Sequence, residues 1–206
     1  MLGVTKCLAI SAVGSLKEEL KPGDFVMPDQ LIDKTNGREY TFFKSPYVAH
    51  VSLANPFCNT LRSAVFNEIK NDGVHFDGTY ICMQGPAFST KAESNLHRQM
   101  GGSLIGMTMS PEAKLAREAQ IAYVSICIVS DYDCWKENEK EVEVSDVIAT
   151  LNTASKKLKE KIPSIVKAIS NTDASKYTRE VLCNALMCNP ENFNQELKEI
   201  HSVLSL

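Results

Sequence analysis

The run IAYVSICIV at residues 121–129 is almost continuously apolar and rich in β-branched side chains. Such a run is typical of a central strand that is covered on both faces. It follows a good helix start, Ser110-Pro111-Glu112, in which serine can cap, proline suits the first turn and glutamate complements the helix dipole. A helix that leads into a buried strand indicates a sheet surrounded by helices.

Strands and helices alternate along most of the chain. Short apolar runs bounded by turn residues predict strands, and apolar residues that recur at helical spacing predict helices. The predicted strands are 5–12, 25–32, 79–83, 103–107 and 121–129. The predicted helices are about 56–73, 89–100, 110–120, a long one from about 145, and two short ones within 171–206 on either side of Asn189-Pro190. We therefore predict one α/β domain over residues 1–206, with a mixed, mainly parallel sheet flanked by helices.

The composition favours a protein that handles small ligands. The formal net charge is −3 and the lysines are scattered, so we predict no nucleic-acid partner. No apolar run is long enough to span a bilayer, and residues 1–12 lack the order of a secretory signal. We expect no membrane partner and a cytoplasmic protein, with the nucleus as the alternative. Seven cysteines without a C-x-x-C pair and four isolated histidines indicate reduced thiols and no zinc site.

Polar residues or glycine follow four of the predicted strands, where open α/β sheets gather ligands. The four segments are 11–15, 84–89, 107–112 and 130–135. Asp131 and Asp133 in the last segment form either a solvated turn or helix cap, or a pair that converges on one ligand edge, as metal ligands or as purine partners. A metal would require further carboxylates at other strand ends, and the sequence lacks them, so we predict no metal site.

The other candidate residues each have a structural alternative. Ser11 and Thr108 offer hydroxyl donors that suit a phosphate, or they cap their own backbone. Phe88 and Met107 would by default be core residues. His50 follows an aromatic-rich stretch and by itself carries no specific signal.

Taken together, the segments closely resemble the 5′-methylthioadenosine phosphorylases, which are trimeric relatives of purine nucleoside phosphorylase. The matching segments are ISAVGSL (10–16), KPGDFVMPDQLID (21–33), QGPAFST (84–90), AESNLHRQMGGSLIGMTMSPEAKLAREA (92–119) and SDYDCW (130–135). The resemblance covers about Leu2 to Ile162. SDYDCW is its most discriminating part, because 6-oxopurine phosphorylases of similar architecture usually carry asparagine where the pair Asp131/Asp133 stands.

The resemblance implies phosphorolysis of 5′-methylthioadenosine to adenine and 5-methylthioribose 1-phosphate, a step of purine and methionine salvage. It implies a homotrimer with phosphate as co-substrate and no cofactor. The implied phosphate ligands are Ser11, Ala12, Thr108 and nearby Ser89. The implied nucleoside contacts are Met107 under the ribose, Phe88 on the purine, Asp131, Tyr132 and Asp133 at the purine edge, Val144, Val147 and Ile148 around the 5′-methylthio group, and His50 in a neighbouring subunit's site.

The residue types suit this chemistry. Cleavage of the glycosidic bond builds negative charge on the leaving adenine, and a protonated carboxyl at N7 lowers that barrier. Asp131 is the expected proton donor. A closed apolar site and the neighbouring charge of Asp133 would raise its pKa enough for it to hold a proton near neutral pH.

The sequence departs from the family in three places. The family's first strand, its Gly-rich phosphate loop and an arginine-histidine pair all precede the segment that matches Met1. Residues 84–89 read QGPAFS where EGPRFS is usual, and the match fades beyond Ile162. We expect a chain truncated at its N-terminus, with a purine pocket and an incomplete phosphate pocket. The alternative is a genuine short paralogue that is catalytically silent and binds purines or partners.

Overall fold

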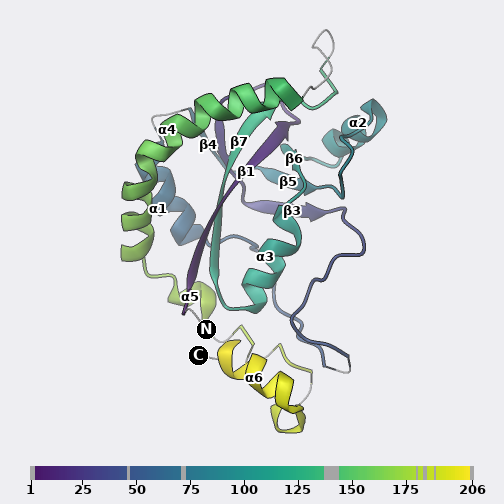
Figure 1. Cartoon of the computed structure of the whole chain (residues 1–206), viewed down its shortest axis with the longest axis vertical. Helices are drawn as coiled ribbons and strands as arrows, with labels where there is room; N and C mark the ends of the chain where they lie inside the picture. The colour runs from purple at the N-terminus through teal and green to yellow at the C-terminus, as the bar shows by residue number, and fades with distance from the viewer. Residues whose placement is uncertain are drawn as a thin grey trace.

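The computed structural model of the chain describes residues 3–45, 47–70, 73–136, 144–179, 181–182, 185–187 and 189–204, without the side chains of residues 144, 146, 190 and 204. At its centre lies a sheet whose strand order, within these residues, is β3-β5-β6-β1-β7-β2-β4 (Figure 1). Four neighbouring pairs of strands are parallel and two are antiparallel. The predicted fold, one α/β domain with a mixed, mainly parallel sheet flanked by helices, is confirmed. The strands are β1 (Lys6–Ser15), β2 (Phe25–Met27), β3 (Gln30–Asp33), β4 (Val74–Phe76), β5 (Thr79–Cys82), β6 (Leu104–Gly106) and β7 (Ala122–Asp131).

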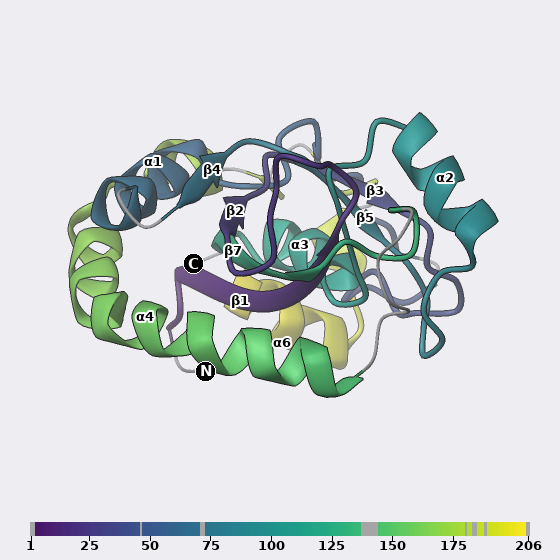
Figure 2. The ribbon, with the colours of Figure 1, turned by 90° about the horizontal axis from the view of Figure 1, so that it is seen from above.

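Helices lie on both sides of the sheet, and the C-terminal helix lies beyond one end of it (Figures 1 and 2). They are α1 (Asn59–Ile69), α2 (Lys91–Gln99), α3 (Met109–Glu118), α4 (Val144–Asn171), α5 (Ser175–Thr178), the short 3₁₀ helix η1 (Pro190–Asn192) and α6 (Gln195–Leu204). Helix α4 continues through Pro163 to Asn171. None of the helices in the described part of the chain is both long enough and apolar enough to cross a membrane.

Strand β7 is the central strand that the sequence predicts, since every residue from Ala122 to Ser130 is buried. Alternate side chains of a strand point to opposite faces of the sheet. On one face Ile126 and Ile128 join the apolar core formed with α1 and α4. On the other face Cys127 and Val129 join the core that includes the start of α3. Burial on both faces accounts for the nearly continuous apolar run.

The prediction of one strand over residues 25–32 is wrong, because the structure forms two short strands there. Pro28 cannot donate a backbone hydrogen bond, and the chain changes neighbours at this point. Strand β2 pairs with β4 and β7, whereas β3 pairs with β5. Asp29 fixes the link between β2 and β3. Its amide donates to the Gly78 carbonyl, and its carboxylate accepts from the Gly78 amide. Strand β4 was not predicted, and its three residues form a strand only beside β2.

The long parallel pair of β1 and β7 positions the site. The pair is continuous from Lys6 to Val13 and then shifts register, so that Gly14 lies opposite Asp131. Strand β6 pairs with β1 only at Gly14 and Ser15. From Lys6 to Val13, the described structure therefore has a strand on one side of β1 only, and its other side borders a cavity.

Candidate active site

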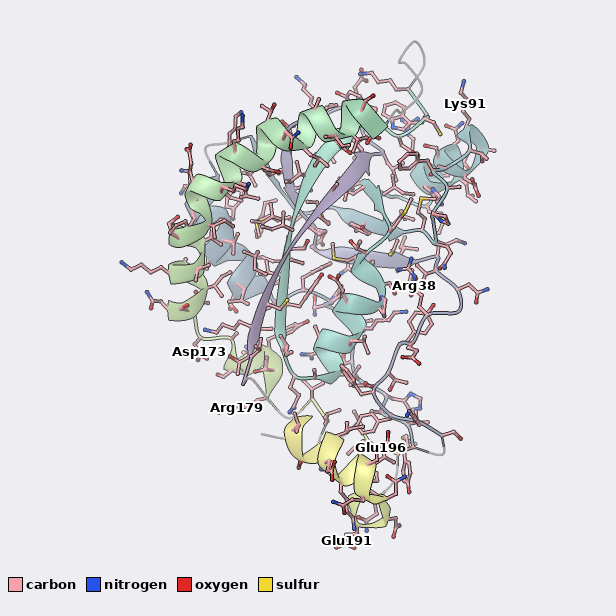
Figure 3. All side chains as sticks on the ribbon, viewed as in Figure 1. Arg38, Lys91, Asp173, Arg179, Glu191 and Glu196 are labelled. Carbon is pink, nitrogen blue, oxygen red and sulfur yellow. The ribbon has the colours of Figure 1, made fainter. Side chains whose placement is uncertain are left out.

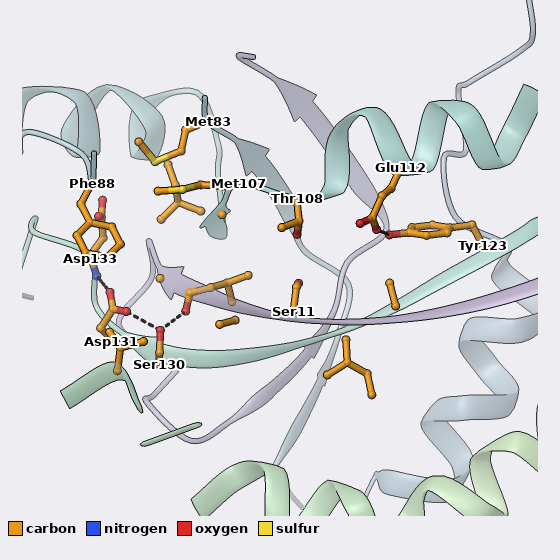
Figure 4. Close-up of a pocket in the computed structure, with 18 of the residues that line it drawn as sticks. Ser11, Met83, Phe88, Met107, Thr108, Glu112, Tyr123, Ser130, Asp131 and Asp133 are labelled. Carbon is orange, nitrogen blue, oxygen red and sulfur yellow. Dashed lines mark hydrogen bonds between the residues drawn. The ribbon is translucent and has the colours of Figure 1, made fainter. Parts of the chain in front are cut away.

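A cavity of about 660 Å³ lies along the open side of β1, between β6, the start of α3 and the end of β7. Figure 4 shows Asp131 and Asp133 at one end and Glu112 and Tyr123 at the other, with Ser11 and Thr108 between them. The lining residues are Cys7, Ala9, Ile10, Ser11, Ala12, Val13, Gly14, Met83, Phe88, Ile105, Gly106, Met107, Thr108, Glu112, Tyr123, Ser130, Asp131, Asp133 and Val147. A mainly apolar cavity with a few polar groups is the usual form of a small-molecule site.

Asp131 is held at the end of β7 by two hydrogen bonds (Figure 4). The Ser130 hydroxyl donates to Oδ2 at 2.6 Å, and the Asp133 amide donates to Oδ1 at 2.7 Å. Gly14 makes room for this carboxyl, because a Cβ there would lie 3.0 Å from Asp131 Oδ1 and 2.9 Å from Ile105 Cγ2. Both oxygens of Asp131 are therefore oriented by protein donors.

The left-handed backbone of Asp133, with φ of 53°, turns the chain so that both carboxyls line one cavity. This conformation is uncommon outside glycine, although aspartate adopts it more readily than most residues. Asp133 is 9% exposed. Of the two alternatives that the sequence leaves open, the structure favours a converging pair over a solvated turn. Among the described residues, no group of three or more histidine, cysteine, aspartate or glutamate side chains could hold a metal ion.

The environment raises the pKa of both carboxyls. Burial raises the pKa of Asp131, the hydrogen bonds from Ser130 and from the Asp133 amide oppose this, and the charge of Asp133 adds to the increase. Burial also raises the pKa of Asp133. Two neighbouring carboxyls in an apolar site are suited to share roles, one as a proton donor and the other as an acceptor.

The middle of the cavity carries neutral donors. Thr108 precedes α3, but its side chain makes no cap hydrogen bond to the helix. Ser11 lies 3.6 Å from the sulfur of the buried Cys127. The lining residues described include no lysine, arginine or histidine. An anion here would therefore rely on hydroxyl and backbone donors.

Apolar side chains cover the acidic end. Phe88 is 52% exposed and lines the cavity, as does Met107. Gly85, with a positive φ of 68°, allows Met107 to approach, because a Cβ at Gly85 would lie 2.5 Å from the Met107 sulfur. A half-exposed phenylalanine beside one buried and one partly buried carboxyl offers a flat apolar surface to a planar ligand.

Several predicted site residues lie outside the lining of this cavity. The Ser89 hydroxyl is 3.8 Å from the Met83 sulfur, and the Tyr132 hydroxyl donates to the Glu18 carbonyl at 3.3 Å. Ile148 is 51% exposed. The His50 amide donates to the Ala185 carbonyl at 2.7 Å, and His50 is not among the described lining residues. Val144 begins α4, and its side chain is outside the described part of the structure, whereas Val147 lines the cavity.

The structure also shows residues that sequence reasoning missed. At the far end the Tyr123 hydroxyl donates to Glu112 Oε2 at 2.7 Å. The one available signal was a tyrosine within an otherwise mostly aliphatic strand. Arg38, labelled in Figure 3, donates to the carbonyls of Met107 and Ser110 and so fixes the turn that carries Thr108.

The prediction that the Ser110 side chain caps a helix is wrong, because its hydroxyl does not bond to the helix. Ser110 has an extended backbone just before Pro111, as a cap residue does. Its hydroxyl donates instead to Asp33 Oδ2 at 2.6 Å, and Lys114 binds the same oxygen. Although burial acts in the opposite direction, these hydrogen bonds, with those from Thr35, lower the pKa of Asp33.

Comparison with known proteins shows the family of the chain. The profile of the phosphorylase superfamily matches residues 1–167, and the chain belongs to that superfamily. Its relatives include S-methyl-5′-thioadenosine phosphorylases from Thermofilum pendens and Geobacter sulfurreducens. The first is 48% identical over 170 residues, which cover 82% of this chain and 64% of the relative. The second is 53% identical over 153 residues, which cover 73% of this chain and 54% of the relative. The chain thus spans less than two thirds of the length of either relative.

Solved structures agree in fold. Methylthioadenosine phosphorylase from Schistosoma mansoni, in complex with adenine, has a TM-score of 0.85 and 35% identity, with 90% of this chain and 73% of that chain covered. A methylthioadenosine phosphorylase from an antarctic soil metagenomic library has a TM-score of 0.85 and 42% identity, with 98% and 72% covered. The resemblance predicted from the sequence, to 5′-methylthioadenosine phosphorylases, is confirmed.

Proposed function

We propose that the cavity along β1 binds 5′-methylthioadenosine and that the chain contributes to its phosphorolysis, giving adenine and 5-methylthioribose 1-phosphate. The observation that carries the proposal is the convergence of Asp131 and Asp133, both with raised pKa, beside the exposed ring of Phe88. Relatives named for this activity support it.

In the proposed reaction a phosphate oxygen attacks C1′ of the ribose as the C1′–N9 bond breaks. The electron pair of that bond moves onto the purine, and Asp131 donates its proton to N7. Asp133 accepts a hydrogen bond from the 6-amino group. General acid catalysis of this kind typically contributes about 10²–10⁴-fold to a rate. Phosphate is the nucleophile, so the reaction needs no protein nucleophile and no cofactor.

The remaining site residues take the roles that the family resemblance implies. Ser11, Ala12 and Thr108 donate to phosphate, with Ser89 nearby, and Met107 lies under the ribose. Val147 borders the 5′-methylthio group together with Val144 and Ile148, and Tyr132 supports the purine edge. His50 acts in a neighbouring subunit of a homotrimer, since it is not among the described residues that line the cavity of its own chain. We propose the cytoplasm as the compartment.

A second candidate is a purine-binding protein without turnover. It is favoured by the absence of a cationic side chain among the described lining residues. Charge-assisted hydrogen bonds are roughly twice as strong as neutral ones, so neutral donors alone would bind phosphate weakly. We therefore expect slow phosphorolysis by this chain. Its rate should be on the order of a thousandfold below that of an enzyme whose phosphate site carries cationic side chains.

One assay separates the candidates. Purified chain is incubated with 5′-methylthioadenosine, with and without phosphate, and free adenine is measured by chromatography, while adenine binding is measured by calorimetry. Release that requires phosphate supports the enzyme. Adenine binding without release supports the silent binder, and neither binding nor release refutes both.

A further inference from the structure

A cluster of buried polar atoms lies behind Asp133, on the side of α2. Within the described residues, Ser94 Oγ, His97 Nδ1 and Asp133 Oδ2 are buried and have no hydrogen-bond partner. Ser94 is fully buried and His97 is 5% exposed. Native proteins pair nearly all of their buried polar groups, so three unpaired atoms in one region require an explanation.

Helix α2 presents Ser94 and His97 on the same face, because residues three positions apart are neighbours on a helix. The helix is fixed at both ends. Thr90 and Glu93 form a capping box at its start. Near its end Arg98 stacks on Trp135 at 3.8 Å and donates to the Leu16 carbonyl.

The loop that carries Asp133 is fixed by the same contacts. Trp135, two residues further along, donates from its indole nitrogen to the Ser15 carbonyl at 2.7 Å. The stacking of Arg98 on this indole ties the loop to α2. The two segments are thus held together, and the buried face of α2 is held against the loop.

The charges around the cluster indicate how its polar atoms can pair. Burial lowers the pKa of His97, the carboxylates of Asp133 and Glu93 oppose this, and Lys34 adds to the decrease. His97 is therefore neutral near pH 7 and has one ring N–H. When Asp133 is ionised, its carboxylate oxygens can only accept hydrogen bonds. A His97 ring with its proton on Nδ1 can donate to Asp133, so this tautomer gives both buried atoms a partner.

The groups around Asp133 oppose the effect of its burial. Burial raises its pKa, and the Ser94 hydroxyl, the Cys134 amide, the His97 ring and the Ser89 hydroxyl act to lower it. Ser94 stands close enough for this effect without reaching hydrogen-bonding geometry. The other ionisable groups nearby are Asp131, whose pKa the charge of Asp133 raises, and the Cys134 thiol, whose pKa is raised by burial and then by Asp133.

We propose that His97 and Ser94 are positioning residues for Asp133: the three unpaired atoms come together, so that both side chains donate to Asp133 Oδ2 and keep the carboxylate ionised and oriented towards the ligand. Asp133 then accepts from the 6-amino group of adenine and repels the oxygen of a 6-oxopurine, while Asp131 keeps the proton. This inference rests on the proposed function, which supplies the purine, and assigns a specificity-determining role to α2.

Two substitutions of His97 test the proposal. His97→Phe removes the ring donor, whereas His97→Asn places an amide N–H near the position of Nδ1. Adenine and hypoxanthine binding are measured by calorimetry between pH 5.5 and 8.5. We expect His97→Phe to weaken adenine binding roughly tenfold, as the loss of one hydrogen bond to a charged group does. Its preference for adenine over hypoxanthine should narrow, and its loss of adenine binding on acidification should begin at higher pH. His97→Asn should stay within about threefold of the parent chain.

The control is Asn95→Ala, an exposed position on α2 that leaves the cluster intact, with a melting temperature recorded for every variant. Equal losses in His97→Phe and His97→Asn, or an unshifted pH profile in a folded His97→Phe variant, would overturn the proposal.

An independent measurement uses the protein without purine. Nitrogen NMR of the His97 ring should show the Nδ1–H tautomer, and Asp133→Asn should shift the Nδ1 signal. The Nε2–H tautomer, or no response to Asp133→Asn, would overturn the proposal whether or not purine binds. If this coupling is present and the parent chain does not bind adenine, the positioning of Asp133 is supported and the proposed function fails.

Discussion

Replacement of Asp131 by asparagine separates hydrogen bonding from proton transfer at the purine edge. The asparagine carbonyl can accept from the Asp133 amide, which now donates to Asp131 Oδ1 at 2.7 Å. Its amide nitrogen then faces the Ser130 hydroxyl, which now lies 2.6 Å from Oδ2. That hydroxyl can accept from the amide and donate to the Val13 carbonyl, 3.1 Å away. Every local group keeps a partner, but the side chain can no longer give up a proton.

The two consequences differ in size. Because the hydrogen bonds are retained, we expect a change in stability of less than about 1 kcal/mol. In a chain of this length that corresponds to a melting temperature change of less than about 4 °C. The loss of a general acid should lower the rate of adenine release by about 10²–10⁴-fold, or roughly 3–5 kcal/mol of barrier. The fixed amide donor should also shift binding from adenine towards 6-oxopurines.

The assay compares parent and Asp131→Asn chains for adenine release from 5′-methylthioadenosine under excess phosphate, with calorimetric binding of adenine and hypoxanthine. Asn95→Ala serves again as a matched control on the surface. If Asp131→Asn turns over the adenine nucleoside within about threefold of the parent, Asp131 is not the general acid.

Three further predictions concern the surroundings of the site. Gly14→Ala places a methyl group 2.9 Å from Ile105 Cγ2 and 3.0 Å from Asp131 Oδ1. We expect overpacking of about 1–3 kcal/mol, seen by denaturant unfolding, with weaker adenine binding, and an unchanged midpoint would show that the strand adjusts freely. Val147→Thr should narrow the preference for methylthioadenosine over adenosine. Burying the 5′-hydroxyl of adenosine without a hydrogen-bond partner costs about 1–3 kcal/mol, and the threonine hydroxyl would provide that partner. If the ratio of the binding constants for methylthioadenosine and adenosine is unchanged, Val147 does not contact the 5′-methylthio group. The stabilisation from Asp33, whose pKa is lowered in the folded chain, should be present above its ordinary pKa of 3.8 and lost as the pH falls below it. In Asp33→Asn the melting temperature should fall less as the pH is lowered below 3.8. An equal fall in both chains would contradict a stabilising role for the Asp33 carboxylate.

The sequence predicted the parts of this fold that depend on local pattern. The apolar run at 121–129 is a buried strand because both faces of the sheet are covered, and this leaves no polar alternation. It could not predict the break at Pro28 or the strand Val74–Phe76, because both depend on which distant strand becomes the neighbour. Likewise, the Ser110 hydroxyl could either cap the helix or bond to a distant residue. The position of Asp33, which the local sequence does not give, decides for the distant bond.

The candidate site was predictable at the strand ends and not behind them. Asp131 and Asp133 stand out because polar residues come at the end of a buried strand, and Ser11 and Gly14 lie in the second half of the neighbouring strand β1. His97 carries no such signal, since a lone histidine on a helix is most often an ordinary core or surface residue. Its interest arises from burial beside Asp133, which depends on how α2 packs against the loop after β7.

A crystal structure of the chain with adenine would show which end of the cavity binds the purine, because carboxylates lie at both ends. We predict adenine against Phe88, with N7 within hydrogen-bonding distance of Asp131 and the 6-amino group within that distance of Asp133. Adenine bound instead beside Glu112 and Tyr123, or outside the cavity, would contradict this prediction.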